Sequence, residues 1–398
     1  MTAEGLPAVL AVDGGNSKTD VALVAADGTL LGSARGPGVA GTMQLTDTLG
    51  VLGSAARLAW KQAGLSAEEP GGRIARHLSA CVANADLPEE EEQLAEAVRA
   101  EGWSDTVKVA NDTFAVLRAG VDDLGPHWGV GVTCGAGINC VGVAPDGRTS
   151  RFLSFGPLSG DWGGGHTLGT QAVFSAIRAE DGRGPQTVLR EAVAAYFGTP
   201  NMWDAAVAIH TGALGWEALL GLVPVLFEAA EAGDAVAVDL VRRQAGEVCV
   251  MVLSAMGRVG LTDQPVPVAL GGGVLAARDP LLISEITKRL AEDAPFAEPR
   301  IVDVPPVVGA ALLGLDHIGA PPAAHARLRD AYRAAAAAGG GEKRDRLRPL
   351  ALGELDVPDE GVQVPHQRLQ SDRSGIEPPV RDDRAQRRRR RHPGSAGS

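Results

Sequence analysis

The chain has 398 residues, of which 45% are hydrophobic and 22% are charged, and its formal net charge at pH 7 is −12. This length allows two domains with a sizeable core. The acidic balance argues against general binding to nucleic acid, whose phosphates would be repelled. Since no apolar stretch has the length of a membrane span and no basic-then-apolar leader begins the chain, we expect a cytoplasmic protein that binds neither nucleic acid nor membrane.

A glycine-rich loop stands between the first two apolar segments, 9–12 and 21–24. It carries Asp13, Gly14, Gly15, Ser17, Lys18 and Thr19. Glycines between two strands allow backbone N–H groups to approach a phosphate. The hydroxyls and the Lys18 ammonium could then contact phosphate oxygens, and Asp13 could hold Mg²⁺, usually through water. The alternative is an ordinary hairpin turn.

The rest of the first half alternates helices and strands. Apolar spacing predicts a helix at 44–64, a strand at 73–83, a helix at 88–98, a strand at 106–110 and a helix ending near residue 119. With the three short segments at the start, which read as strands, this half has the order βββαβαβα.

Asn111 and Asp112 come directly after the strand at 106–110. A carboxylate at that point faces the crevice where ligands gather in open α/β sheets. Asp112 is therefore suited to take a proton from a substrate hydroxyl as a general base. The alternative is a helix N-cap, for which Asn111, Asp112 and Thr113 are all suitable. The spacing alone leaves both interpretations open.

The same order of elements begins again near residue 128. A turn at Asp146 follows a similar turn at Asp27 by 119 residues. The loop between the first two strands of this second half contains Thr133, Gly135 and Gly137. Two glycine loops, one in each half, indicate a nucleotide clasped between two related domains.

Two further glycine-rich segments follow in the second half. The loop at 156–165 contains Gly160 and Asp161. Asp161 could bind sugar hydroxyls with its two carboxylate oxygens, and the alternative is a flexible surface turn. Gly271, Gly272 and Gly273 follow an apolar strand. Their bare backbone could lie flat against a nucleobase, and the alternative is a tight strand-to-helix turn.

The remaining elements complete the repeat. We expect helices at 167–178, 280–291 and 307–315, strands at 267–270 and 300–304, and a helical insertion at about 186–262. The domains are then 1–118 and 119–320, followed by a terminal helix at 321–338.

Residues 339–398 lose periodicity and predict a disordered tail. The arginine run at 387–391 could attract nucleic acid or membrane, or it could be inert. The four cysteines are scattered, which predicts buried small residues and not a zinc or disulfide framework.

Taken together, the motifs resemble the N-acetylglucosamine kinase branch of the BadF/BadG/BcrA/BcrD ATPase-like family, within the actin-like and hexokinase-like ATPase superfamily. The resemblance covers roughly residues 8–318. It rests on Asp13-Gly14-Gly15 with Lys18-Thr19, on Asn111-Asp112, on Gly135-Ala136-Gly137-Ile138-Asn139-Cys140, on Gly160-Asp161 and on Gly271-Gly272-Gly273. It implies a two-domain α/β fold with the nucleotide in the interdomain cleft, ATP and Mg²⁺ as cofactors, and a homodimer.

The resemblance also implies roles for individual residues. Those that would contact the ATP phosphates are Gly14, Gly15, Lys18, Thr19, Gly135 and Gly137, and those that would border the adenosine are Gly271, Gly272 and Gly273. Asp112 would act as base toward the 6-hydroxyl of an amino sugar, with N-acetylglucosamine as the first candidate. Asp161 would bind the sugar hydroxyls, and Asn139, Asn111 and Gly160 would lie near the sugar. Thr133 could supply the phosphate contact that the hydroxyl residues of the second loop often make in this family.

Two other functions fit the same fold. One is an ATPase that activates a 2-hydroxyacyl-CoA dehydratase, which would require an iron–sulfur cluster. The other is a non-catalytic sugar sensor. The scattered cysteines argue against the first, and the presence of Asp13, Asp112 and Asp161 argues against the second.

Overall fold

The structure is a computed structural model that describes residues 6–39, 43–65, 72–123, 125 and 127–338. The tail predicted at 339–398 lies outside the described residues. The first half consists of β1 (Val9–Gly14), β2 (Lys18–Val24), β3 (Leu30–Pro37), α1 (Leu45–Gln62), β4 (Ala75–Val82), α2 (Pro88–Ala100), β5 (Ser104–Asn111) and α3 (Asp112–Gly120). This is the predicted order βββαβαβα.

The second half repeats that order with added helices. Its repeat elements are β6 (Gly129–Cys134), β7 (Ile138–Val143), β8 (Thr149–Arg151), α8 (Ala235–Val259), β9 (Val266–Gly271), α9 (Gly273–Ala276), α10 (Pro280–Asp293), β10 (Ala297–Ile301) and α11 (Pro306–His317). Between β8 and α8 come η2 (Gly156–Ser159), α4 (Gly165–Glu180), α5 (Leu189–Tyr196), α6 (Met202–His210), η3 (Trp216–Gly221) and α7 (Leu222–Glu231). The chain continues after α11 into α12 (Pro322–Ala338).

The described residues form two five-stranded sheets with the same topology. Their strand orders are β3-β2-β1-β4-β5 and β8-β7-β6-β9-β10, the second given from the opposite edge. In each sheet the first three strands pair antiparallel, and the last two run parallel to the first. The duplication predicted from the two glycine loops is confirmed.

The parallel strands bring their carboxyl ends to one edge of each sheet. In the first sheet, Gly14 of β1 pairs in register with Val82 of β4, and Val82 pairs with Asn111 of β5. In the second sheet, Thr133 of β6 pairs with Gly271 of β9. The segments that follow these strands are therefore held next to one another, as the carboxyl edge of a parallel sheet requires.

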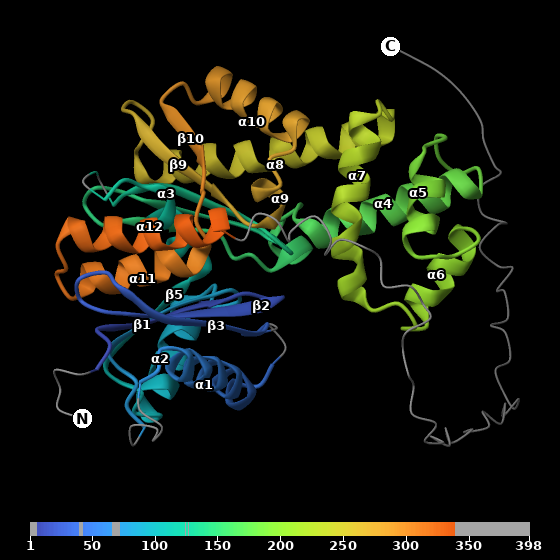
Figure 1. Cartoon of the computed structure of the whole chain (residues 1–398). Helices are drawn as coiled ribbons and strands as arrows, with labels where there is room; N and C mark the ends of the chain where they lie inside the picture. Colours follow the sequence, from blue (N-terminus) through green and yellow to red (C-terminus); the bar gives the residue numbers. More distant parts are fainter. Residues whose placement is uncertain (1–5, 40–42, 66–71, 124, 126, 339–398) are drawn as a thin grey trace, which may run out of the picture. The chain divides into compact units, whose positions relative to one another are not determined.

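Helices α3 and α11 lie between the two sheets (Figure 1). Each packs mainly on the sheet of the other half: α3 on β6 and β9, and α11 on β1 and β4. The two helices approach closely at Gly309, where an added Cβ would stand 1.9 Å from the carbonyl oxygen of Ala115. Only glycine permits this crossing, which joins the two halves through their central helices.

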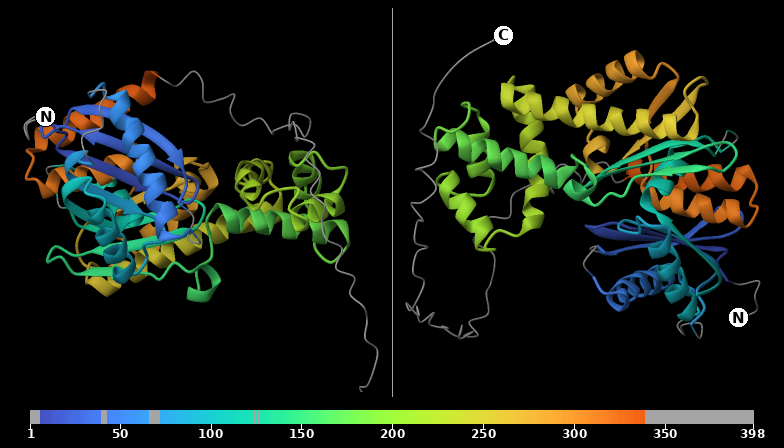
Figure 2. Two further views of the ribbon diagram at one scale, coloured as in Figure 1. Left: turned by 90° about the horizontal axis from the view of Figure 1, so that it is seen from below. Right: turned by 180° about the vertical axis from the view of Figure 1, so that it is seen from behind.

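The helix at the end of the predicted insertion belongs to the repeat. Helix α8 packs on β7, β6 and β8, as α1 packs on β3 and β2 in the first half. The added part is therefore 165–231, from α4 to α7, and not 186–262. These helices lie together to one side of the second sheet (Figure 2). Sequence periodicity could not separate them, because both stretches are helical and apolar on one face.

The edge strand β10 also differs from its prediction at 300–304, since it begins at Ala297. Its sequence contains Pro299, Glu298 and Arg300, which obscure a strand signal but are tolerated at a sheet edge. All four cysteines are buried and free, as predicted. No helix in the described part of the chain is both long enough and apolar enough to cross a membrane.

Candidate active site

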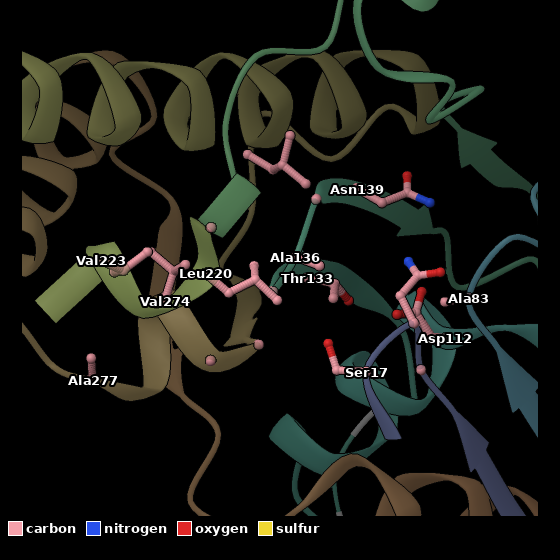
Figure 3. A pocket seen from close by; sticks show the side chains of 18 of the residues that line it. Ser17, Ala83, Asp112, Thr133, Ala136, Asn139, Leu220, Val223, Val274 and Ala277 are labelled. Carbon is pink, nitrogen blue, oxygen red and sulfur yellow. The ribbon is translucent and has the colours of Figure 1, made fainter. Parts of the chain in front are cut away.

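A cavity of about 820 Å³ lies where the carboxyl ends of both sheets meet. The first half contributes the loop after β1, the segment after β4 and Asp112 after β5. The second half contributes both glycine corners together with α7 and α9. Figure 3 shows Ser17, Asp112 and Asn139 toward one end of the cavity and Leu220, Val223 and Val274 toward the other. The cavity thus has a polar end and an apolar end.

The loop after β1 brings Asp13, Gly15, Ser17 and Lys18 to the cavity. Lys18 pairs with Asp20, so its ammonium is already partly neutralised. Arg35 of β3 also binds Asp20, with Nε 2.6 Å from Oδ1. Asp20, which Arg35 also holds, therefore keeps the Lys18 ammonium at the cavity, where it can turn toward a bound anion.

Three cavity carboxylates, Asp13, Asp86 and Asp112, have raised pKa values. Burial raises the pKa of Asp112 to about 6. Burial, and then the nearby charge of Asp112, raise the pKa of Asp13 to about 7, while Lys18 opposes this shift. Buried carboxylates with perturbed pKa values in a cleft are typical of catalytic or cation-binding groups.

Asp112 is the first residue of α3, and Asn111 is its N-cap. The side-chain oxygen of Asn111 accepts hydrogen bonds from the Thr113 N–H at 3.1 Å and the Thr113 hydroxyl at 2.6 Å. The capping interpretation thus applies to Asn111. The carboxylate of Asp112 is left to line the cavity, at a helix N-terminus that favours its ionised form.

Asp86, in the segment after β4, connects the two halves beside Asp112. Its Oδ1 accepts one hydrogen bond from the Asn111 amide at 2.9 Å and one from the Asn139 amide at 3.1 Å. Burial, followed by the charge of Asp112, raises the pKa of Asp86 to about 7. Asn139 belongs to β7, so this cluster joins the end of one sheet to the start of the other.

The glycine loop after β6 is fixed against the start of α4. The N–H of Gly165 donates to the Gly135 carbonyl at 2.7 Å, and that of Gly135 donates to the Gly137 carbonyl at 2.9 Å. At Gly164, which has φ +83°, an added Cβ would lie 2.4 Å from the Gly137 carbonyl carbon. The Thr133 hydroxyl next to this loop is buried and has no hydrogen-bond partner in the described structure.

The corner after β9 also requires glycine. Gly272 has φ +88°, and an added Cβ would lie 2.4 Å from the backbone carbonyl of Cys134. Gly273 begins α9 and has open space around its Cβ position. The backbone of Gly272 therefore packs directly on the end of β6, while Gly273 faces the cavity.

The apolar end of the cavity lies between α7 and α9. Val223 and Phe227 come from α7, and Val274 comes from α9, with Ala277 just beyond it. Glu228, Glu231 and Arg278 also line this part of the cavity, so the slot has apolar faces with charged groups beside them. Such a slot suits a flat ring system, because burial of its faces is favourable.

Several residues predicted for the site do not line the cavity. They are Gly14, Thr19, Asn111, Gly160, Asp161 and Gly271. Thr19 is fully buried in β2 and does not reach the cavity, so its predicted contact with phosphate stays a prediction. Gly14 and Gly271 are the last residues of β1 and β9, so they lie just behind the cavity wall. Asn111 contacts Asp86 and Asn139, which line the cavity, but it does not line the cavity itself.

Asp161 lies outside the cavity wall but close to the polar end. Its Oδ2 accepts a hydrogen bond from the Ser159 hydroxyl at 2.5 Å, and its charge contributes to the raised pKa of Asp86. Gly160, with φ +84°, ends η2 just before it. In this structure neither residue reaches the cavity, because the turn at 156–160 keeps the Asp161 carboxylate hydrogen-bonded to Ser159.

Sequence reasoning missed Asn16, Asn84 and Asp86, which all line the cavity. Asn84 has φ +68° and donates to Asn16 Oδ1 at 2.7 Å and to the Val39 carbonyl at 3.2 Å. The signal for them was available, since polar residues directly after a parallel strand gather at the ligand edge of the sheet. Asn84 and Asp86 follow β4 as Asp112 follows β5.

Comparisons with known proteins show two curated relatives that are named as amino-sugar kinases. An N-acetyl-D-glucosamine kinase from Dictyostelium discoideum is 28% identical over 217 residues, which are 54% of this chain and 67% of the relative. An N-acetylmuramic acid/N-acetylglucosamine kinase from Clostridium acetobutylicum is 25% identical over 270 residues, which are 67% of this chain and 85% of the relative.

Two solved structures share the fold. A provisionally assigned N-acetylglucosamine kinase from Chromobacterium violaceum aligns with a TM-score of 0.61 and 24% identity, covering 78% of this chain and 99% of its own. A ROK family glucokinase from Streptomyces griseus, solved with glucose and AMPPNP, aligns with a TM-score of 0.50 and 18% identity, covering 77% and 98%. The fold is thus the actin-like, hexokinase-like ATPase fold. The model of the BadF/BadG/BcrA/BcrD ATPase family matches residues 10–314, and the chain belongs to this family.

Proposed function

We propose that this protein is an ATP-dependent kinase that phosphorylates the 6-hydroxyl of an amino sugar, with N-acetylglucosamine as the first candidate substrate. The observation that carries the proposal is the partly buried carboxylate of Asp112 in a cavity that has a glycine loop from each half on its walls. The names of both curated relatives support the same activity and the same class of sugar.

The two ends of the cavity suggest the orientation in which the proposed nucleotide would bind. The loops at Gly15 and at Gly135 and Gly137 would bind the phosphates through backbone N–H groups, and the unpartnered Thr133 hydroxyl would donate to a phosphate oxygen. The slot between α7 and α9 would take the base, with Gly273 beside it. The triphosphate would then point toward Asp112.

The residues present also fit Mg²⁺. Among the described residues no group of three or more His, Cys, Asp or Glu could hold a metal ion by itself. Mg²⁺ in phosphoryl-transfer sites typically uses only one or two carboxylates, keeping waters and phosphate oxygens as its other ligands. Asp13 would be such a carboxylate, since a cation there offsets the burial and the Asp112 charge that raise its pKa. When bound, the ion would neutralise phosphate charge.

Asp112 would orient the sugar hydroxyl and accept its proton as the phosphoryl group is transferred. Positioning accounts for most of the catalysis in such a reaction, so the rigid support of Asp112 by β5 and the Asn111 cap is as important as its basicity. Asn139 would lie near the sugar, and Asp161 would bind sugar hydroxyls once the halves close on the substrate. Closure would exclude water and so limit hydrolysis of ATP.

A coupled assay of ADP release tests the proposal. N-acetylglucosamine, glucosamine, N-acetylmannosamine and glucose are supplied in turn with ATP and Mg²⁺. We expect ADP release that depends on one amino sugar and yields its 6-phosphate. ADP release without any sugar would favour an ATPase, and sugar binding without ADP release would favour a sensor.

Replacement of Asp112 tests the residue assignment. Asp112→Asn keeps the shape of the side chain but removes the base, so we expect phosphorylation to fall by a factor of about 10²–10⁴ while ATP still binds. Full turnover by this variant would refute the role of Asp112. The proposal also includes a cytoplasmic location and a homodimer, and light scattering on the purified chain tests the second.

A further inference from the structure

We propose that Asp86 is a second sugar-binding carboxylate, which accepts a substrate hydroxyl other than the phosphorylated one and sets the orientation of the Asn111 and Asn139 amides. This inference rests on the proposed function, because it assumes that a sugar occupies the polar end of the cavity. It concerns a residue to which sequence analysis gave no role.

The first argument is the position of Asp86. It lines the cavity together with Asp112 and Asn139, and it lies close enough to Asp112 for the charge of that residue to raise its pKa. The charge of Asp161 acts on it as well. Asp86 is therefore near both the proposed base and the carboxylate predicted to bind sugar hydroxyls.

The second argument is the unequal use of its two oxygens. Oδ1 accepts amide hydrogens from Asn111 at 2.9 Å and from Asn139 at 3.1 Å. Oδ2 accepts no hydrogen bond from any residue in the described ranges. Asp86 lines the cavity, so this oxygen is free to accept a hydrogen bond from a bound molecule, and a sugar hydroxyl is a donor of the right size and polarity.

The third argument is that the backbone around Asp86 is held in place. Its own N–H donates to Oε2 of Glu90 at 3.0 Å, and the N–H of Leu87 donates to the same atom at 3.0 Å. The bond from Leu87, the N-cap of α2, to Glu90 is the glutamate half of a capping box. A carboxylate on a fixed backbone can select one hydroxyl geometry, which is what substrate discrimination requires.

Through Oδ1, Asp86 binds one amide from each half of the chain, those of Asn111 and Asn139. Asn111 and Asn139 are 4% and 8% exposed, and the Asn139 amide also approaches Asn111 Oδ1 at 3.3 Å. Asn111 precedes Asp112, while Asn139 follows the second glycine loop. Asp86 thus positions the residue before the proposed base and a residue next to the proposed phosphate loop at the same time.

The test compares wild type, Asp86→Ala and Asp86→Asn on the sugar that the wild type phosphorylates and on its monodeoxy analogues. We expect Asp86→Ala to lower kcat/KM for the sugar by about 10- to 100-fold, as loss of a hydrogen bond to a charged group does. The KM for ATP should change by less than about threefold. Asp86→Asn keeps an acceptor for the two amides and should recover part of the loss.

The analogues separate substrate binding from a merely structural role. In the wild type, one deoxy analogue should lose as much kcat/KM as the Asp86→Ala substitution does. In the variant that same analogue should lose nothing further, while the other analogues lose as much as before. If every analogue loses the same factor in both proteins, Asp86 does not bind a hydroxyl and the inference is overturned.

Two controls complete the experiment. Glu89→Gln removes a neighbouring exposed charge in the first turn of α2 and should leave all constants unchanged. Thermal unfolding of each variant shows whether the fold is kept, and Asp86→Asn supplies the folded case if Asp86→Ala unfolds. A wild-type chain that phosphorylates no sugar refutes the proposed function as well, whereas an active wild type with an unchanged analogue pattern refutes this inference alone.

Discussion

Arg151 of β8 and Glu91 of α2 form an ion pair that joins the two halves beside Asn111, the residue before Asp112. One guanidinium nitrogen of Arg151 lies 2.7 Å from Oε1 of Glu91 and 2.9 Å from its Oε2. Oε1 also accepts the backbone N–H of Asn111 at 2.7 Å. The guanidinium stands 4.8 Å from the ring centre of Phe114 on α3. The strand end that carries the proposed base is therefore tied to both halves.

We predict that Glu91→Gln lowers kcat about tenfold while the KM for ATP stays nearly constant, because the strand end that presents Asp112 loses its charged anchor. The free energy of unfolding should fall by about 1–3 kcal/mol, since the Arg151 charge then stays partly buried without its partner. Steady-state kinetics and urea unfolding measure the two effects.

The control for this prediction is Glu92→Gln on the same helix. Glu92 pairs with Arg99 at 2.8 Å, but both side chains are exposed, so the change in stability should stay below about 1 kcal/mol. Equal losses from the two variants would contradict the role given to the pair of Glu91 and Arg151. A double-mutant cycle of Glu91→Gln with Arg151→Met isolates the coupling energy between the two residues.

Substitutions at two threonines with unpartnered hydroxyls can distinguish a hydroxyl that binds phosphate from one that is only buried. Thr133 lines the cavity, whereas Thr19 is fully buried in β2 and does not reach it. Thr133→Val should raise the KM for ATP or lower kcat by about tenfold, as loss of one phosphate contact does. Thr19→Val should leave both constants unchanged and, by removing an unpaired buried hydroxyl, keep or raise stability by about 1 kcal/mol. A higher KM for ATP or a lower kcat in the Thr19→Val variant would support the predicted contact of Thr19 with phosphate.

The duplicated fold could be predicted because its signals are local. Glycine loops, tight turns and alternating apolar runs recur at the same spacing in both halves, and each depends only on nearby residues. The bounds of the insertion could not be predicted, since only contact with β7 shows that α8 belongs to the repeat. Periodicity reports that a face is buried but does not report what covers it.

The site was predicted where a residue follows a strand or glycine loop, as Asp112 and Gly135 do. The sequence analysis missed Asp86 because its hydrogen-bond partners, Asn111 and Asn139, are far along the chain, and only the two sheets bring them together. Thr19 was assigned to phosphate with Ser17 and Lys18, because all three were placed in the glycine-rich loop between the first two strands. Alternation along β2 turns its side chain away from the side that Lys18 faces, a consequence that depends on where the strand begins.

Adjacent glycines at the corner after β9 should respond differently to the same change. Gly272→Ala would place a Cβ 2.4 Å from the Cys134 backbone at a φ of +88°, so we expect severe destabilisation and loss of soluble folded protein. Gly273→Ala meets nothing within 4 Å, so the fold should survive. Its methyl group would face the nucleotide slot and raise the KM for ATP several-fold. Thermal unfolding and ATP titration distinguish these outcomes, and a well-folded Gly272→Ala protein would contradict the packing described.

The raised pKa of Asp112 links activity to pH. Its pKa of about 6 reflects burial of the carboxylate, and the base must be ionised to accept a proton. We therefore expect kcat/KM to be level above about pH 7 and to fall roughly tenfold per pH unit below about pH 5. A profile with no acidic limb above pH 4 would contradict this environment for Asp112.

The same shift predicts that Asp112 opposes folding at neutral pH. Because the folded-state pKa lies above the unfolded value of about 3.9, the folded chain binds more protons between about pH 4 and pH 6. The stability associated with this group is therefore present below about pH 4 and is lost as the pH rises through about 6. Asp112→Asn removes the ionisable group, so the variant should be more stable than the wild type at pH 7.5, by about 1–3 kcal/mol. Urea unfolding at pH 7.5 and pH 4.5 measures the difference, which should shrink at the lower pH. A variant that is less stable than the wild type at pH 7.5 would show that the carboxylate is held there by favourable contacts and is not a destabilised catalytic base.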